Sequence, residues 1–425
     1  MFFMPNILKN LKVTNKHSLT GVICFVLLPF GTGFYLSYLY RTMNLVIEPQ
    51  LRLEFDLGAS GIGFLTGIYF ISFAAVQIPV GIAIDYFGPK RVQIVLLSVA
   101  AIGGVVFAFG NNFLELAIGR LLIGIGVAGG IVSVLSANAI WFKPDQQPLM
   151  NSIGVCFGGL GALSATLPME LLLSFVSWRE LFISVSVFTI ALVVFIWFVV
   201  PDKRVALSES KTFRAHYEIF VQIFMDSYFW RIGFLIITGF AAYISYQSLW
   251  AGPWLRDVAG FERLARAEIL LLVQLGMFTG ILFGGLLADR VASRGKALER
   301  LISIGVVLYF LCQIGLILGL IMFASILWFG FGFFGSVLFL TYSLYGQYYP
   351  ASVNGRVNTA NNLLMFGLVF ITQWGVGIFI EQWPSLGEQK YPAVAHQWAL
   401  FIVLAMELVA FIWFIFPRDL VKEKA

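Results

Sequence analysis

The chemically most distinctive side chains of this sequence are charged groups that lie inside long apolar runs. Arg41 and Arg120 are the two arginines of this kind, and Glu170 and Glu407 are the two acids. An arginine in hydrocarbon is costly, so it usually faces a cavity or a partner and marks a functional position. A carboxyl group in a low dielectric can load a proton. These residues therefore predict anion binding and proton transfer.

Arg41 shares one helix face with aromatic side chains. Phe34, Tyr38 and Arg41 follow the i, i+4, i+7 spacing that places residues on one side of a helix. A guanidinium group offers two parallel donors, so this face predicts capture of a carboxylate or another anion. The alternative is that Arg41 extends to the outer headgroups of a membrane.

A second polar and aromatic stripe is predicted about two hundred residues later. It comprises Tyr243, Tyr246, Gln247 and Trp250. Such a stripe often serves packing alone, but its polar groups need partners in apolar surroundings. We expect it to contribute to a substrate site, together with the amide of Gln373.

The other buried charges leave two interpretations open. Arg120 predicts either proton coupling and gating or a structural hydrogen bond. Glu170 predicts an ion pair with Arg41 or Arg120, and proton symport follows if substrate competes for that pair. Glu407 is expected to be a neutral, structural acid.

The elements that must position these residues are membrane spans. The chain has 425 residues, of which 60% are hydrophobic and 12% charged, and its mean hydropathy is +0.90. Soluble proteins carry about 25% charged residues, so a soluble body is excluded. Runs of about 20 apolar residues predict twelve spans. They cover residues 19–46, 61–83, 92–109, 113–138, 152–176, 181–200, 232–254, 269–288, 301–322, 325–345, 359–380 and 398–416.

The spans group into two halves. A polar stretch separates six spans from six, which predicts an N-terminal bundle at 1–200, a cytoplasmic linker at 201–229 and a C-terminal bundle at 230–425. Most of the 27 lysines and arginines fall on the side that holds the termini. The excess of positive charge predicts that both termini are cytoplasmic. We therefore expect a multi-pass protein of a bacterial inner membrane.

A short loop after the second span of each half suggests a duplication. The first copy contains Gly81, Asp85, Gly88, Lys90 and Arg91. The second contains Gly285, Asp289 and Arg290 in the same order. An acid at a helix end can accept hydrogen bonds from the N-terminus of a neighbouring helix, where the dipole is positive. These loops are predicted to gate the protein rather than to bind its substrate.

With these motifs, the chain resembles the major facilitator superfamily over nearly its whole length. The first loop matches the family signature except at Tyr86, where a base is usual. Arg120, Gly124 and Gly126 match a second motif, whose glycines allow close helix approach. The resemblance implies an all-α membrane protein of two pseudo-symmetric six-helix bundles, with the substrate site near the midplane.

The first span is similar to those of organophosphate antiporters and organic-anion symporters, which place an anion-binding arginine where this chain has Arg41. The second arginine of the phosphate-ester antiporters is absent from residues 242–250. The resemblance thus implies proton-coupled uptake of a small organic anion or zwitterion, such as a carboxylate, an amino acid or a peptide.

Other functions remain as alternatives or are excluded. An exporter of amphipathic compounds is the first alternative, although the glycine-proline motif of drug antiporters is missing from residues 158–168. A receptor with a transport fold is the second. The sequence has no P-loop, no H-E-x-x-H and no G-x-S-x-G motif, so ATP-driven transport and intramembrane enzymes are not expected. Its three cysteines are isolated, and no metal or other cofactor is predicted. The expected partners are a substrate, a proton and the lipid bilayer, and we expect a monomer that binds no nucleic acid.

Overall fold

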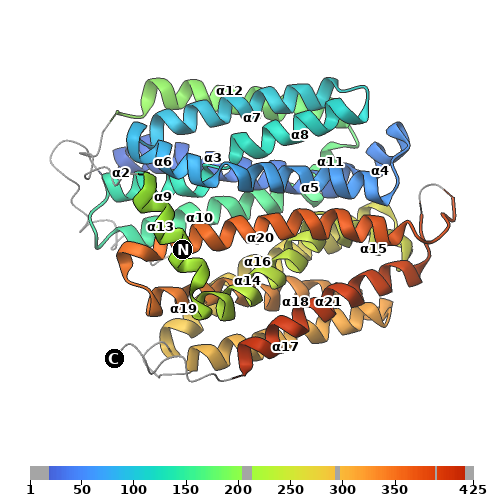
Figure 1. The fold of residues 1–425 in the computed structure, drawn as a ribbon. Coiled ribbons are helices and arrows are strands. Elements are labelled where there is room, and N and C mark those ends of the chain that lie inside the picture. Colours follow the sequence, from blue (N-terminus) through green and yellow to red (C-terminus); the bar gives the residue numbers. More distant parts are fainter. Residues whose placement is uncertain (1–18, 203–212, 292–296, 388–389, 417–425) are drawn as a thin grey trace, which may run out of the picture. The chain divides into compact units, whose positions relative to one another are not determined.

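The computed structural model describes residues 19–202, 213–291, 297–387 and 390–416, which form helices and no strands (Figure 1). Both ends of the chain, part of the predicted linker and the residues that follow Val291 in the second loop lie outside these residues. The described helices separate into two compact units, and each unit is considered by itself.

The first unit comprises helices within Met1–Arg41, Val76–Ala162 and Ser177–Glu209. Helices α7, α8 and α12 run side by side in it (Figure 1). Its elements are α2 (Leu19–Val22), the π-helix η1 (Ile23–Leu27), α3 (Leu28–Thr42), α6 (Gln77–Phe87), α7 (Pro89–Phe109), α8 (Phe113–Val127), α9 (Gly130–Trp141), α10 (Gln147–Ser164) and α12 (Trp178–Val199).

Local sequence signals explain where several of these helices begin and how they pack. The Asn112 side chain accepts from the Glu115 amide at the start of α8, and Ser177 with Glu180 forms a capping box at the start of α12. At Gly126, an added Cβ would lie 2.2 Å from the Ala100 nitrogen. The glycine therefore allows α7 and α8 to approach closely, in keeping with the close helix approach that the motif's glycines predict.

The second unit comprises helices within Thr42–Ala75, Leu163–Val176 and Ser210–Ala425. Helix α5 packs along α20 in it (Figure 1). Its elements are α4 (Asn44–Phe55), α5 (Ala59–Ala75), α11 (Leu167–Leu172), α13 (Phe213–Met225), α14 (Ser227–Ser245), the π-helix η2 (Tyr246–Trp250), α15 (Ala251–Asp257), α16 (Arg263–Val291), α17 (Ala297–Ile317), the 3-10 helices η3 (Ile321–Phe323) and η4 (Ser336–Leu340), α18 (Ala324–Gly335), α19 (Thr341–Tyr348), α20 (Ala351–Ile380) and α21 (Ala393–Ile415).

The helices agree with a polytopic membrane protein. Among the described residues, ten helices are long and apolar enough to cross a membrane, and the bent pair α5 and α6 gives an eleventh span. The predicted fifth span corresponds to α10 and α11, which a break at residues 165–166 interrupts. The twelve predicted spans are consistent with this arrangement.

The compact units do not coincide with the two halves of the sequence. Segments Thr42–Ala75 and Leu163–Val176 come from the first half of the chain but belong to the second unit. The two halves of the sequence are defined by the repeated loop motif. The two compact units are defined by which residues pack together in the structure. The boundaries at 1–200, 201–229 and 230–425 therefore stay a prediction.

Candidate functional site

Arg41 lies in the last turn of α3, in the first unit, and its side chain is buried, with 9% exposed. Its guanidinium carbon lies 4.6 Å from the centroid of the Tyr38 ring, and Phe34 meets the same ring edge-on at 5.2 Å. A cation held against an aromatic face gains electrostatic stabilisation. The three residues therefore form the aromatic and cationic face that their spacing predicts.

Arg120 is fully buried on α8, and its Nη1 donates to the carbonyl oxygen of Tyr40 at 2.9 Å. The Tyr40 hydroxyl in turn lies 3.4 Å from the Ser186 hydroxyl and 3.3 Å from that of Thr189. These contacts tie α3 to α8 and α12. The structure thus gives Arg120 a structural hydrogen bond, and its role in coupling stays a prediction.

In the second unit, the predicted polar stripe lies where α14 passes into the π-helix η2. π-Helical turns inside α-helices are rare and are frequent at functional sites. The side chains of the stripe contact different neighbouring helices. Tyr243 donates to the carbonyl of Gly332 at 3.1 Å, and Tyr246 packs on Trp328 and Phe331.

Gln247 and Trp250 instead contact α16 and α20. The Nε2 of Gln247 donates to the Oε1 of Gln274 at 2.7 Å, and the Trp250 indole donates to the carbonyl of Gln373 at 3.2 Å. The Gln373 side chain donates to the Ser248 hydroxyl at 3.0 Å. We call Gln247, Ser248, Gln274 and Gln373 the amide cluster.

The amide cluster has hydrogen-bonding capacity to spare. All four side chains are buried, with at most 3% exposed. The Nε2 donor of Gln274 and the Oε1 acceptor of Gln373 have no hydrogen-bond partner among the described residues. Because buried polar groups are normally paired, these two atoms are available to a ligand. Gln274 was missed at the sequence level, although a lone amide inside an apolar span is the signal that would have found it.

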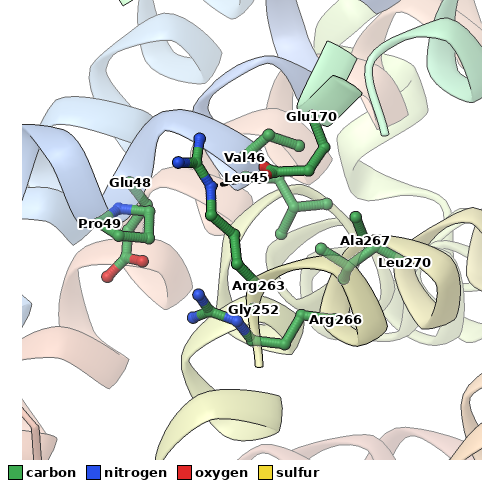
Figure 2. A pocket seen from close by; sticks show the side chains of 10 residues that line it. All are labelled: Leu45, Val46, Glu48, Pro49, Glu170, Gly252, Arg263, Arg266, Ala267 and Leu270. Carbon is green, nitrogen blue, oxygen red and sulfur yellow. Dashed lines mark ion pairs between the residues drawn. The ribbon is translucent and has the colours of Figure 1, made fainter. Parts of the chain in front are cut away.

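Glu170, on α11, lines a small cleft and forms an ion pair with Arg263 at the start of α16 (Figure 2). Figure 2 shows Arg263 rising between Glu170 and Glu48, with Arg266 beside it. The cleft has a volume of about 20 Å³, space for roughly one water molecule. The sequence predicted Arg41 or Arg120 as the partner of Glu170, and the structure supplies Arg263 instead. Arg263 lies outside the predicted spans. It was therefore not among the charged residues within apolar runs that the sequence singled out.

A buried charge network near this cleft was also missed. Glu48 pairs with Arg52 one turn along α4 and with Arg256 of α15 at 3.2 Å. Arg256 pairs with Asp257 at 2.6 Å, and Asp257 lies 2.9 Å from His396 of α21. The predicted first span ends at residue 46, so Glu48 and Arg52 lie outside the predicted spans. Both side chains are 1% exposed.

The predicted gate residues lie at helix ends. Helix α6 ends at Phe87, Gly88 adopts a positive φ of 79°, and α7 begins with Pro89. Asp85 and Arg91 are exposed, and Arg91 pairs with Asp202 at 2.8 Å.

The remaining predicted gate residues are at least partly accessible to solvent. Lys90 is half-buried, and nothing lies within 4 Å of a Cβ added at Gly81. In the second copy Asp289 and Arg290 are exposed in the last turns of α16. Their gating role stays a prediction.

Comparison with known proteins identifies the family. The model of the Major Facilitator Superfamily matches residues 30–372, which is most of the chain. The chain belongs to the major facilitator superfamily. It is therefore a multi-pass membrane transporter and not an enzyme.

Its curated relatives include transporters of organic anions. A protein of Cupriavidus necator described as a probable sulfoacetate transporter is 26% identical over 295 residues, which are 67% of each chain. A hexuronate transporter of Bacillus subtilis is 26% identical over 285 residues, 64% of this chain and 66% of that protein. The matches thus span about two thirds of these relatives.

Solved structures share the fold. An inward-facing bacterial homologue of the human lysosomal transporter Spinster matches with a TM-score of 0.72 at 17% identity, covering 92% of this chain and 96% of that one. A D-xylose-proton symporter matches with a TM-score of 0.70 at 14% identity, covering 94% and 98%. The major facilitator architecture predicted from the sequence is therefore confirmed.

Proposed function

We propose that this transporter takes up a small organic anion or zwitterion together with a proton, and that Arg41 binds the anionic group. The observation that carries the proposal is the burial of Arg41 against Tyr38 in the first span, with 9% of the side chain exposed. A guanidinium group presents two parallel donors that match a carboxylate or another anion. The names of two relatives denote organic anions and support this substrate class.

The amide cluster is proposed to recognise neutral polar groups of the substrate. Gln274 offers a free donor and Gln373 a free acceptor. A site with both kinds of group binds hydroxyl, amide or carboxyl groups and rejects analogues that lack them, because its own polar atoms would stay unpaired. In this proposal Trp250 positions Gln373, and Tyr243 and Tyr246 shape the π-helical turn.

The loop residues Gly81, Asp85, Gly88, Lys90 and Arg91, with Asp289 and Arg290, are proposed to gate the cytoplasmic side. The distribution of lysine and arginine supports cytoplasmic termini, and the bacterial relatives support an inner membrane. For Glu170, the ion pair with Arg263 supports a gate whose opening separates α11 from α16. Arg120 and Glu170 are also proposed to take part in proton coupling.

The substrate is found first by thermal shift of the purified protein. A panel of sulfoacetate, hexuronates, other carboxylates and amino acids is compared with neutral sugars. A ligand at a hundred times its Kd stabilises the folded protein by about 2.7 kcal/mol. We expect stabilisation by anions, lost in Arg41→Ala and retained in Arg300→Ala, which removes an exposed arginine of α17. Equal stabilisation of both variants by the anions would contradict the proposal.

A further inference from the structure

Glu407 is a buried acid that the proposed substrate site does not use. It lies on α21 with 1% of its side chain exposed, and its Oε2 accepts from the Nε2 of Gln313 on α17 at 2.7 Å. Its Oε1 and the Oε1 of Gln313 have no hydrogen-bond partner among the described residues. The Tyr309 hydroxyl, one turn before Gln313, lies close to the carboxyl without completing a hydrogen bond. Two buried oxygen atoms, the Oε1 of Glu407 and the Oε1 of Gln313, thus lack a hydrogen-bond donor.

Within the described part of the chain, no cation pairs with Glu407. On α14, Arg231 contacts the carbonyl of Phe414 and pairs with Glu299. On α21 itself, His396 pairs with Asp257. At 1.5 Å per residue along α21, the backbone of Phe414 lies about 10 Å from that of Glu407 and the backbone of His396 about 16 Å from it. Among titratable side chains, the Tyr309 hydroxyl lies beside the carboxyl, and Tyr246 lies within its electrostatic reach.

An ionised carboxylate in this position would have neither a counter-ion nor a full set of donors. Burying such a charge costs far more than burying the neutral acid. The Glu407 carboxyl therefore holds a proton in this conformation, and it can release the proton only when the helices around it admit water.

Aromatic rings connect this carboxyl to the amide cluster. The ring centroid of Tyr309 lies 5.0 Å from that of Phe331, and Phe331 lies 6.2 Å from Tyr246. Tyr246 opens the π-helix η2, and the next residue is Gln247 of the amide cluster. Packed aromatic rings thus lie between the Glu407 carboxyl group and the π-helix η2, which carries Gln247 of the amide cluster.

We propose that Glu407 is the site at which the coupling proton binds. The inference rests on the proposed proton-coupled uptake, and it assigns the residue that binds the proton whose entry drives uptake of the substrate. In the loaded form, a proton taken from water occupies the carboxyl group and the helices pack as seen here. When the proton returns to water, the carboxylate that remains requires hydration, so α14, α17 and α21 must separate and η2 must move. Substrate affinity at the amide cluster then depends on the proton.

The experiment is infrared difference spectroscopy of the reconstituted full-length protein, which needs no known substrate. Wild-type protein is expected to show the C=O stretch of a buried protonated carboxyl group at pH 7. Glu407→Gln should remove this band, whereas Glu170→Gln should leave it. In Gln313→Leu the band should shift, because the hydrogen bond to Oε2 is lost; this variant keeps the test valid if Glu407→Gln does not fold. A band that survives Glu407→Gln unchanged, or no band at all in the wild type, overturns the proposal.

A transport measurement then separates this inference from the proposed function. With sulfoacetate in proteoliposomes, Glu407→Gln should retain exchange of labelled for unlabelled substrate and lose accumulation driven by an inward proton gradient. Accumulation that persists in Glu407→Gln overturns the proton site while leaving anion transport intact. Absence of transport of every anion in wild type would instead refute the proposed function, and the infrared result would still decide whether Glu407 is protonated.

Discussion

The packing of α5 against α20 predicts a large effect of a single methyl group at Gly63. A Cβ at this position would lie 2.5 Å from the carbonyl oxygen of Gln373 and 3.3 Å from the Trp250 ring. Carbon contacts are favourable at about 3.5–4.0 Å, so in Gly63→Ala the helices must separate by about 1 Å. Overpacking of this kind costs about 1–3 kcal/mol. The obstacle is backbone, so no side-chain rotation relieves it.

The assay is thermal unfolding followed by tryptophan fluorescence, at one scan rate because membrane proteins often unfold irreversibly. Gly367→Ala is the control: this glycine lies on α20 as well, and nothing lies within 4 Å of an added Cβ. Alanine in a helix is favoured over glycine by about 0.5–1 kcal/mol, so the control should unfold at the wild-type temperature or above it. Gly63→Ala should unfold lower and raise the KM for substrate, since Gln373 is displaced. If the two variants unfold at the same temperature, the close contact of α5 and α20 is wrong.

Three further substitutions test the charged and polar clusters. Glu48→Gln should lower the free energy of unfolding by about 3 kcal/mol or more, because it removes the buried carboxylate that both Arg52 and Arg256 contact; wild-type stability would contradict the network. Glu170→Gln should cost at most about 1 kcal/mol, because 47% of the Arg263 side chain is exposed, and a larger loss would show that the pair is shielded from water. Gln274→Leu should weaken substrate binding about tenfold or more with little change in anion selectivity, and unchanged binding would exclude the amide cluster from the site.

Patterns within single helices were predicted well from the sequence. The apolar runs predicted the spans, and the spacing of Phe34, Tyr38 and Arg41 predicted one helix face. Each of these depends on residues a few positions apart, so helical periodicity is enough to derive them.

Features that depend on tertiary contacts were not predicted. The π-helical turn that begins at Tyr246 was not predicted, and Tyr246 packs there on Trp328 and Phe331. The pair of Glu170 with Arg263 joins segments far apart in the chain. Helix α4 continues through Pro49 to Phe55, beyond the predicted end of the first span at residue 46, which places Glu48 inside the packed unit.

The central claim is that Arg41 binds the anionic group of the substrate, and uptake into proteoliposomes by Arg41→Lys and Arg41→Ala tests it most directly. A lysine keeps the charge but loses the two parallel donors of the guanidinium group. We predict that Arg41→Ala abolishes uptake of sulfoacetate or whichever anion stabilises the wild type, and that Arg41→Lys raises its KM at least about tenfold, or about 1.4 kcal/mol. Uptake of the anion by Arg41→Ala at the wild-type rate and KM would contradict the account.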